Sequence, residues 1–207
     1  MKIILIILVV GVVLWSAYGY FAVRNIEEPA YTVVEERGGY EIRTYAPHLV
    51  AETRVEGTFN DALNQGFRLI ADYIFGNNTE SSQIAMTVPV AEQKGVAIAM
   101  TVPVAEVQDG GLRVISFVMP SKYTLATIPK PNNSKVKLRE VPERTMAVLS
   151  YSWWSGSSYV ESQKKALVAL VTKDGLTSVG EPEDAFYNPP WTPPFLLRNE
   201  ILLEIQR

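Results

Sequence analysis

Two identical copies of one nine-residue stretch, IAMTVPVAE, occupy positions 84–92 and 98–106 of the sequence. Each copy alternates apolar with small or polar side chains and then reaches a proline, Pro89 in the first copy and Pro103 in the second. Because proline has no N–H to offer a sheet ladder, each copy is predicted to be a short strand that stops or bends there. Gly95 lies in the link between the copies, so we expect the pair to fold back as a hairpin-like excursion.

The clearest strand pattern of the chain follows directly, at residues 112–119. Ile115, Phe117 and Met119 lie at alternate positions and therefore share one face of the predicted strand. The repeated stretch and this strand are predicted to form the middle of a β-sheet, with which the flanking segments pair.

A second, longer repeat relates residues 42–51 (IRTYAPHLVA) to residues 138–147 (LREVPERTMA). A strand, a glycine and an amphipathic helix follow each copy. Two strand–strand–helix units with additional strands predict an α+β fold, in which a curved sheet has pseudo-twofold symmetry and one helix from each half covers it.

The two helices are predicted from their apolar spacing and their caps. The first begins after Thr58, includes Gly66 at a cost of about 1 kcal/mol relative to alanine, and carries one apolar stripe formed by Phe59, Leu63, Phe67, Ile70 and Ile74. The second begins at Ser158, which forms a capping box with Glu161, and runs to Thr172. The proline-rich residues 185–194 (AFYNPPWTPP) are predicted to be an ordered loop. Arg198 and Glu200 are expected to clamp this loop by hydrogen bonds.

Residues 3–23 contain no charged side chain. As a helix they would extend about 31 Å, close to the hydrocarbon thickness of a bilayer. Aromatic residues typical of a membrane interface gather at the end of this segment, namely Trp15, Tyr18, Tyr20 and Phe21. We therefore expect residues 1–24 to be a membrane anchor, 25–30 a linker and 31–207 one domain. The alternative is a signal peptide cleaved near residues 17–19, which would release an exported soluble protein.

The charges that flank the apolar segment predict its orientation. Lys2 and the N-terminal amine precede it, whereas Arg24 is followed by Glu27 and Glu28. The positive-inside rule therefore favours a single-pass protein with the domain on the non-cytoplasmic side.

The composition argues against several classes of function. The formal net charge is −3 with no basic block, which argues against a nucleic-acid partner. The absence of cysteine excludes disulfides, thiolate metal sites and a cysteine nucleophile, and the single histidine, His48, excludes paired-histidine metal sites. With no glycine-rich phosphate loop and no nucleophile–histidine–acid set, we expect neither a metal site nor an enzyme.

Five stretches, taken in order, resemble the SOUL haem-binding family: YEIR at 40–43, the repeated IAMTVPV motif at 84–90 and 98–104, VISFVMPSKYTLATIPKP at 114–131, VKLREVP at 136–142, and YNPPWTP at 187–193 followed by RNE at 198–200. The resemblance covers nearly all of residues 31–207. It implies a distorted β-barrel flanked by two helices, similar to gyrase-inhibitor-like effector-binding domains. It also implies binding of haem or another tetrapyrrole rather than catalysis. Where some members have a histidine after the YEIR stretch, this chain has Thr44.

The resemblance further implies an apolar cleft beside the first helix of the domain and near the proline-rich loop. In this sequence the corresponding residues are Leu63, Phe67, Ile70, Ile74, Tyr187 and Trp191. The same helical stripe is also what any helix packed on a sheet would show. Arg68 and Lys122 are candidates to bind the propionates of a porphyrin, or else are solvated surface residues.

His48 is the only imidazole that can serve as an axial haem ligand, but the turn after Pro47 favours a solvent-facing residue at this position. The function predicted from the sequence is a membrane-anchored carrier or buffer of haem or another tetrapyrrole. The alternatives are a membrane-tethered structural or interaction module without haem, and a binder of another hydrophobic small molecule. The sequence does not identify a protein partner.

Overall fold

The computed structural model describes residues 1–24, 26–79, 96–109, 111–154, 156–189 and 191–206. The first copy of the nine-residue stretch, at 84–92, lies outside the described residues. The helices are α1 (Lys2–Val23), α2 (Phe59–Ile74), α3 (Ser157–Lys173) and the short 3-10 helix η1 (Pro194–Leu196). The strands are β1 (Tyr31–Arg37), β2 (Tyr40–Tyr45), β3 (His48–Val55), β4 (Asn78–Thr79), β5 (Val104–Asp109), β6 (Leu112–Val118), β7 (Lys130–Pro131), β8 (Val136–Val141), β9 (Arg144–Tyr151), β10 (Thr177–Phe186) and β11 (Asn199–Gln206).

Nine strands form one antiparallel sheet in the order β1-β2-β9-β11-β10-β5-β6-β3-β8, and β4 pairs with β7 separately. The expected β-barrel is wrong, because β1 and β8 are edge strands that do not pair with each other. The side chains of β1 are almost all exposed, and its pairing with β2 is irregular between Val33 and Glu35. Glu35, Glu36 and Arg37 keep this edge charged, as is common for strands at the open edge of a sheet.

The strand order has the twofold relation that the longer sequence repeat predicts. Each half follows the order strand, strand, helix, strand, strand: β2, β3, α2, β5 and β6 in the first, and β8, β9, α3, β10 and β11 in the second. Apart from β1, which has no counterpart, exchanging each strand of the sheet for its counterpart reproduces the strand order in reverse. The halves meet where β5 pairs with β10, and each also contributes an outer strand, β2 or β8, to the other half.

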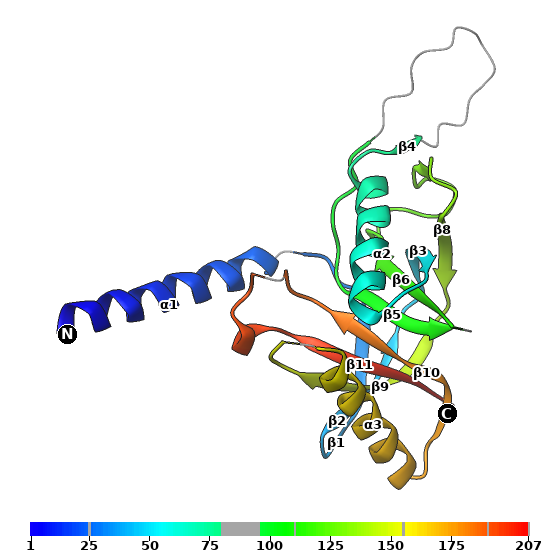
Figure 1. Ribbon diagram of the computed structural model, residues 1–207. Helices are drawn as coiled ribbons and strands as arrows, with labels where there is room; N and C mark the ends of the chain where they lie inside the picture. Colours follow the sequence, from blue (N-terminus) through cyan, green and yellow to red (C-terminus); the bar gives the residue numbers. More distant parts are fainter. Residues whose placement is uncertain (25, 80–95, 110, 155, 190, 207) are drawn as a thin grey trace, which may run out of the picture.

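Both α2 and α3 cover the same face of the sheet (Figure 1). Under α2, Ile70, Tyr73 and Ile74 pack with Ile115 and Phe117 of β6 in the largest apolar cluster. Under α3, a second cluster joins α3 to β2, β9 and β11. Two smaller clusters lie on the opposite face of the sheet.

Gly66 explains how closely α2 approaches the sheet. A Cβ atom at this position would lie 2.6 Å from the Cβ of Ile115. The helix propensity lost at Gly66 therefore allows α2 to rest directly on β6.

Three local predictions differ from the structure. Strand β5 begins at Val104, after Pro103, while residues 98–103 form no strand; instead the Ile98 N–H donates to the Ile74 carbonyl at the end of α2. Helix α3 has Gly156 as its N-cap and no side-chain capping bond, so the expected capping box is wrong. The proline-rich loop starts later than expected, because β10 continues through Phe186.

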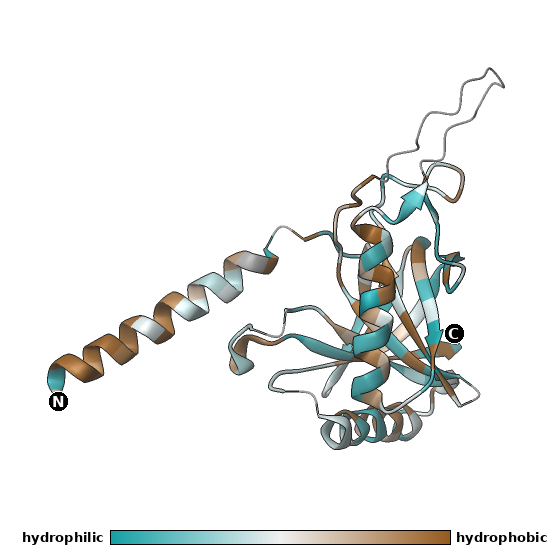
Figure 2. Cartoon of the chain, turned by 45° about the horizontal axis from the view of Figure 1, so that its top comes forward, coloured by the Kyte–Doolittle hydropathy of each residue, from teal (hydrophilic) through white to brown (hydrophobic). Residues whose placement is uncertain are grey.

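Helix α1 extends away from the domain and is hydrophobic along most of its length (Figure 2). It has the length and composition of a membrane span or of a signal sequence. Its C-terminal part contacts the domain at η1.

Replacing Gly66 by alanine should destabilise the protein, although alanine is the better helix former, because the added methyl group overpacks the contact with Ile115. We expect the free energy of unfolding to fall by about 1–3 kcal/mol, measured by denaturant unfolding. Gly38→Ala is the matched control, since a Cβ there meets no atom within 4 Å. An increase in stability for Gly66→Ala would contradict the packing of α2 described above.

Candidate functional site

Most of the predicted α2 stripe is core. Ile70 and Ile74 are fully buried, and Leu63 is half-buried where the two large clusters meet. Phe67 is the exception: 42% of it is exposed, and its ring centroid lies 5.4 Å from that of Phe117. Of these stripe residues, only Phe67 is exposed enough to contact a ligand, so the stripe does not offer a continuous apolar surface.

The predicted loop residues do not join this stripe. Tyr187 is buried on the opposite face of the sheet, in a cluster with Tyr45, Met146 and Leu202. Trp191 is exposed, and its carbonyl accepts a hydrogen bond from Trp15 of α1. Among the described residues, the stripe and the loop thus lie in separate places. The expected cleft formed by both is not supported by the structure.

A cleft does lie beside α2, on its other flank. Its volume is about 470 Å³, within the range of about 300–1,000 Å³ typical of small-molecule sites. Its lining contains apolar, polar and charged residues from α2, from β3 and the residue after it, from the start of β6, and from β8 with the segment before it: Glu52, Thr53, Arg54, Val55, Glu56, Gln65, Leu69, Leu112, Ser134, Lys135 and Lys137. The cleft is therefore more polar than the family resemblance implies.

Helical geometry explains why the stripe does not line this cleft. Leu69 and Phe67 are two residues apart, which places them about 200° apart around the helix axis. A second hollow on α2 shares Gln65 and Leu69 with the cleft and includes Arg68. The other predicted cation, Lys122, is exposed and lies 4.9 Å from the ring centroid of Tyr123. It belongs to neither hollow.

His48 lines a cavity on the opposite face of the sheet, between the two halves. This cavity has a volume of about 90 Å³, far below that of a typical small-molecule site. The Nδ1 atom of His48 lies 2.8 Å from the Ala46 carbonyl, so Nδ1 carries the proton of the neutral ring. Burial, together with Arg144, lowers the pKa of His48 below its ordinary value. His48 is therefore a half-buried, neutral side chain that lies apart from the cleft beside α2.

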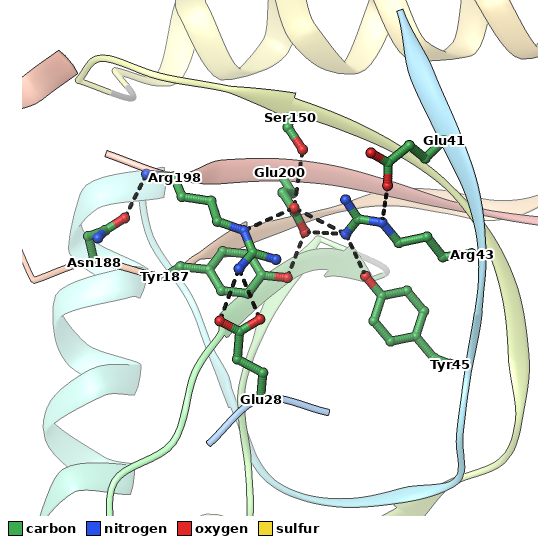
Figure 3. Close-up of polar contacts among 9 residues, drawn as sticks. All are labelled: Glu28, Glu41, Arg43, Tyr45, Ser150, Tyr187, Asn188, Arg198 and Glu200. Atoms are coloured by element: carbon green, nitrogen blue, oxygen red, sulfur yellow. Dashed lines mark hydrogen bonds and ion pairs between the residues drawn. The ribbon is translucent and has the colours of Figure 1, made fainter. Parts of the chain in front are cut away.

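An extensive polar network surrounds the Glu200 carboxylate on β11 (Figure 3). Only 1% of Glu200 is exposed, and its oxygens accept hydrogen bonds from Arg43, Ser150, Tyr187 and Arg198. The shortest of these is the 2.6 Å bond from the Tyr187 hydroxyl. Burial and the nearby carboxylate raise the pKa of Tyr187 well above its ordinary value, so the hydroxyl keeps its proton and acts as the donor.

Arg198 connects this network to the proline-rich loop and to the linker after α1. Its guanidinium forms two 2.9 Å hydrogen bonds to Glu28 and stacks 3.8 Å from the ring centroid of Tyr187 (Figure 3). Its backbone N–H donates to Asn188. The predicted clamp by Arg198 and Glu200 is therefore confirmed. No local pattern signals the contribution of Arg43, which is 157 positions from Glu200.

A second buried ionic group lies where the halves meet, under the helices. Glu106 of β5 and Asp184 of β10 are opposite each other in the sheet and are fully buried. Arg113 lies 2.7 Å from Glu106, and Lys164 of α3 lies 2.9 Å from Asp184. Burial and Glu106 raise the pKa of Asp184, while Lys164 opposes the increase. Two cations thus face two carboxyl groups, as expected of a structural ion network.

Replacing Glu200 by glutamine should lower the free energy of unfolding by about 3 kcal/mol or more, because Arg43 would keep a buried charge without its main partner. Glu41→Gln is the matched control. Glu41 also pairs with Arg43 but is 37% exposed, so we expect a loss of less than about 1 kcal/mol. Equal losses in denaturant unfolding would show that burial of Glu200 is not what matters.

The imidazole of His48 should titrate below pH 6.5 in the folded protein. Since His48 is the only histidine, its ring protons can be followed by NMR without assignment, and the urea-unfolded chain provides the reference. Because folding disfavours the charged ring, this group lowers stability as the pH falls from about 6.5 toward the folded pKa. A midpoint at or above the unfolded value would contradict the buried placement of His48.

Comparison with known proteins agrees with this architecture. The family model described as SOUL heme-binding protein matches residues 26–204. Heme-binding protein 2 of Homo sapiens is 27% identical over 159 residues, which cover 74% of each chain. Heme-binding protein 2 of Mus musculus is 27% identical over 186 residues, covering 86% of this chain and 85% of the mouse protein.

A similar fold occurs at much lower sequence identity. The crystal structure of the EcmrR C-terminal domain superimposes with a TM-score of 0.58 at 10% identity, covering 86% of this chain and 98% of that one. This likeness concerns the fold alone, whereas the family model matches most of the sequence. The chain belongs to the SOUL haem-binding protein family.

Proposed function

We propose that this protein binds haem or another tetrapyrrole in the cleft beside α2 and acts as a membrane-anchored, non-catalytic carrier or buffer of that ligand. Family membership supports the class of ligand. The location proposed for the ligand rests on one observation: a cleft of about 470 Å³ lies beside the first helix of the domain and has lysines in its wall.

The lining of the cleft suits a flat apolar ring with two carboxylates. Leu69, Val55 and Leu112 offer apolar surface. Lys135 and Lys137 form no ion pair within the described part of the chain, so both are available to propionates. Two other charged groups of the wall are already paired: Glu52 with Arg139 at 2.9 Å, and Arg54 with Asp109 at 3.5 Å.

The cleft does not supply an axial ligand from its described lining, which contains no His, Met or Tyr. Binding would therefore depend on the porphyrin ring and its propionates rather than on the metal. A metal-free porphyrin should then bind about as well as haemin, which is consistent with carriage of more than one tetrapyrrole.

Two contacts between α1 and the domain support an uncleaved anchor. Trp15 donates a 2.8 Å hydrogen bond to the Trp191 carbonyl, and buried Gly19 packs against Pro193. With Lys2 before the span, the domain would lie on the non-cytoplasmic side.

The test is a titration of the full chain in detergent with haemin and with protoporphyrin IX, followed by absorbance and fluorescence. The double variant Lys135→Glu/Lys137→Glu should weaken binding of both ligands by about tenfold or more, equivalent to about 1.4 kcal/mol. Lys122→Glu, a charge reversal outside the cleft, and His48→Ala should bind as the unmodified chain does.

The other outcomes separate the alternatives. A linear, nonsaturable response of the unmodified chain would remove the tetrapyrrole proposal and favour a membrane-tethered interaction module. Saturable binding that is unchanged in the double variant would place the ligand elsewhere. Binding of haemin alone, abolished by His48→Ala, would show that the iron is coordinated by the protein.

A further inference from the structure

All four tryptophans of the chain gather at the side of the domain where α1 arrives. Trp153 and Trp154 lie in the connection between β9 and α3, and Trp191, Phe195 and Leu196 lie in the connection between β10 and β11. These five residues, called here the aromatic patch, are between 39% and 67% exposed. The Trp153 N–H donates a 2.9 Å hydrogen bond to the Pro194 carbonyl, and Asn199 donates to the Trp153 carbonyl. The two connections therefore form one surface.

The aromatic patch lies alongside α1 rather than beyond its end. The indole N–H of Trp15 donates to the Trp191 carbonyl, and a Cβ on Gly19 would lie 2.8 Å from Pro193. Trp15 is about two turns, or about 12 Å, before the end of α1 at Val23. The η1 segment is next to this part of the helix in Figure 1. A bilayer crossed by residues 3–23 would therefore reach the level of the patch.

The residues of the aromatic patch suit the boundary between the lipid headgroups and the acyl chains. The sequence has no charged residue between Arg144 and Glu161 or between Asp184 and Arg198, the two intervals that contain the patch. Tryptophan and phenylalanine are favoured at the boundary between headgroups and acyl chains, where amphipathic elements bury their apolar side about 5–10 Å deep. A protein surface held at this level by α1 would otherwise expose five large apolar side chains to water.

We propose that the aromatic patch inserts into the headgroup–acyl boundary of the same bilayer that α1 spans, so that the domain is held against the membrane at two places. This inference rests on the proposal that α1 is a retained anchor. Its partner is the lipid surface itself.

The absence of cysteine permits a direct test in the full chain reconstituted in phosphatidylcholine vesicles. Four single variants carry an environment-sensitive fluorophore: Phe195→Cys and Trp154→Cys in the patch, Val10→Cys in α1, and Val179→Cys as control. Val179 is 39% exposed, like Leu196, and pairs in the sheet with Glu204, near the C-terminus and on the side away from α1 (Figure 1). Lipids that carry a nitroxide either near the headgroup or deep in the acyl chain serve as quenchers.

We expect both patch labels to be blue-shifted and quenched most strongly by the headgroup-level nitroxide. The Val10 label should be quenched by the deep nitroxide, and the Val179 label by neither.

Quenching at Val10 without quenching at Phe195 or Trp154 would overturn the inference and leave the anchor intact. No quenching at Val10 would instead remove the anchor. A blue shift of the patch labels that rises with protein density without lipid quenching would assign the patch to a second copy of the chain and also overturn the proposal. The two patch variants lie in separate connections, so a folding defect in one leaves the other to decide.

Discussion

A buried negative charge, the Glu200 carboxylate, is the interaction on which the arrangement of this domain depends. A carboxylate that leaves water is strongly unfavourable unless its lone pairs are satisfied, and here four side chains from different parts of the chain satisfy them. Arg43 connects β2, Ser150 connects β9, and Tyr187 and Arg198 connect the proline-rich loop. Through Glu28, the same network reaches the linker after α1. The position of the domain relative to its N-terminal helix is thus coupled to the middle of the sheet.

The fold has pseudo-twofold symmetry, whereas the candidate site does not. Both helices bury their apolar sides against the same face of the sheet, and the halves meet at the paired acids Glu106 and Asp184. The proposed ligand cleft, in contrast, uses the flank of α2 and lysines before and within β8. The apolar core thus follows the repeat, whereas the lining of the proposed cleft comes from one half and the strand β8 that pairs with it.

The sequence predicts the elements whose signals are local. Thr58 and the apolar spacing of α2 give its bounds, because a capped amphipathic helix is defined by residues within a few turns of each other. The sequence does not predict β10, since Gly180 and Pro182 interrupt its pattern at an irregularity in the pairing with β11. The apolar spacing of α2 identifies the side of the helix that packs on the sheet, where Ile70 and Ile74 are buried, and it carries no signal for the cleft on the other flank. The pairing of Arg43 with Glu200 depends on the sheet order, which no local pattern reveals.

The uncovered edge of β1 has a consequence for how copies of this protein behave when crowded. An open sheet edge is a template for strand addition from a neighbouring chain, and attachment to a membrane would concentrate such edges in two dimensions. The irregular pairing at Val33 and Glu35 bends the strand, and Glu35, Glu36 and Arg37 keep it charged. Both features oppose edge-to-edge pairing of β1 with the sheet of another copy.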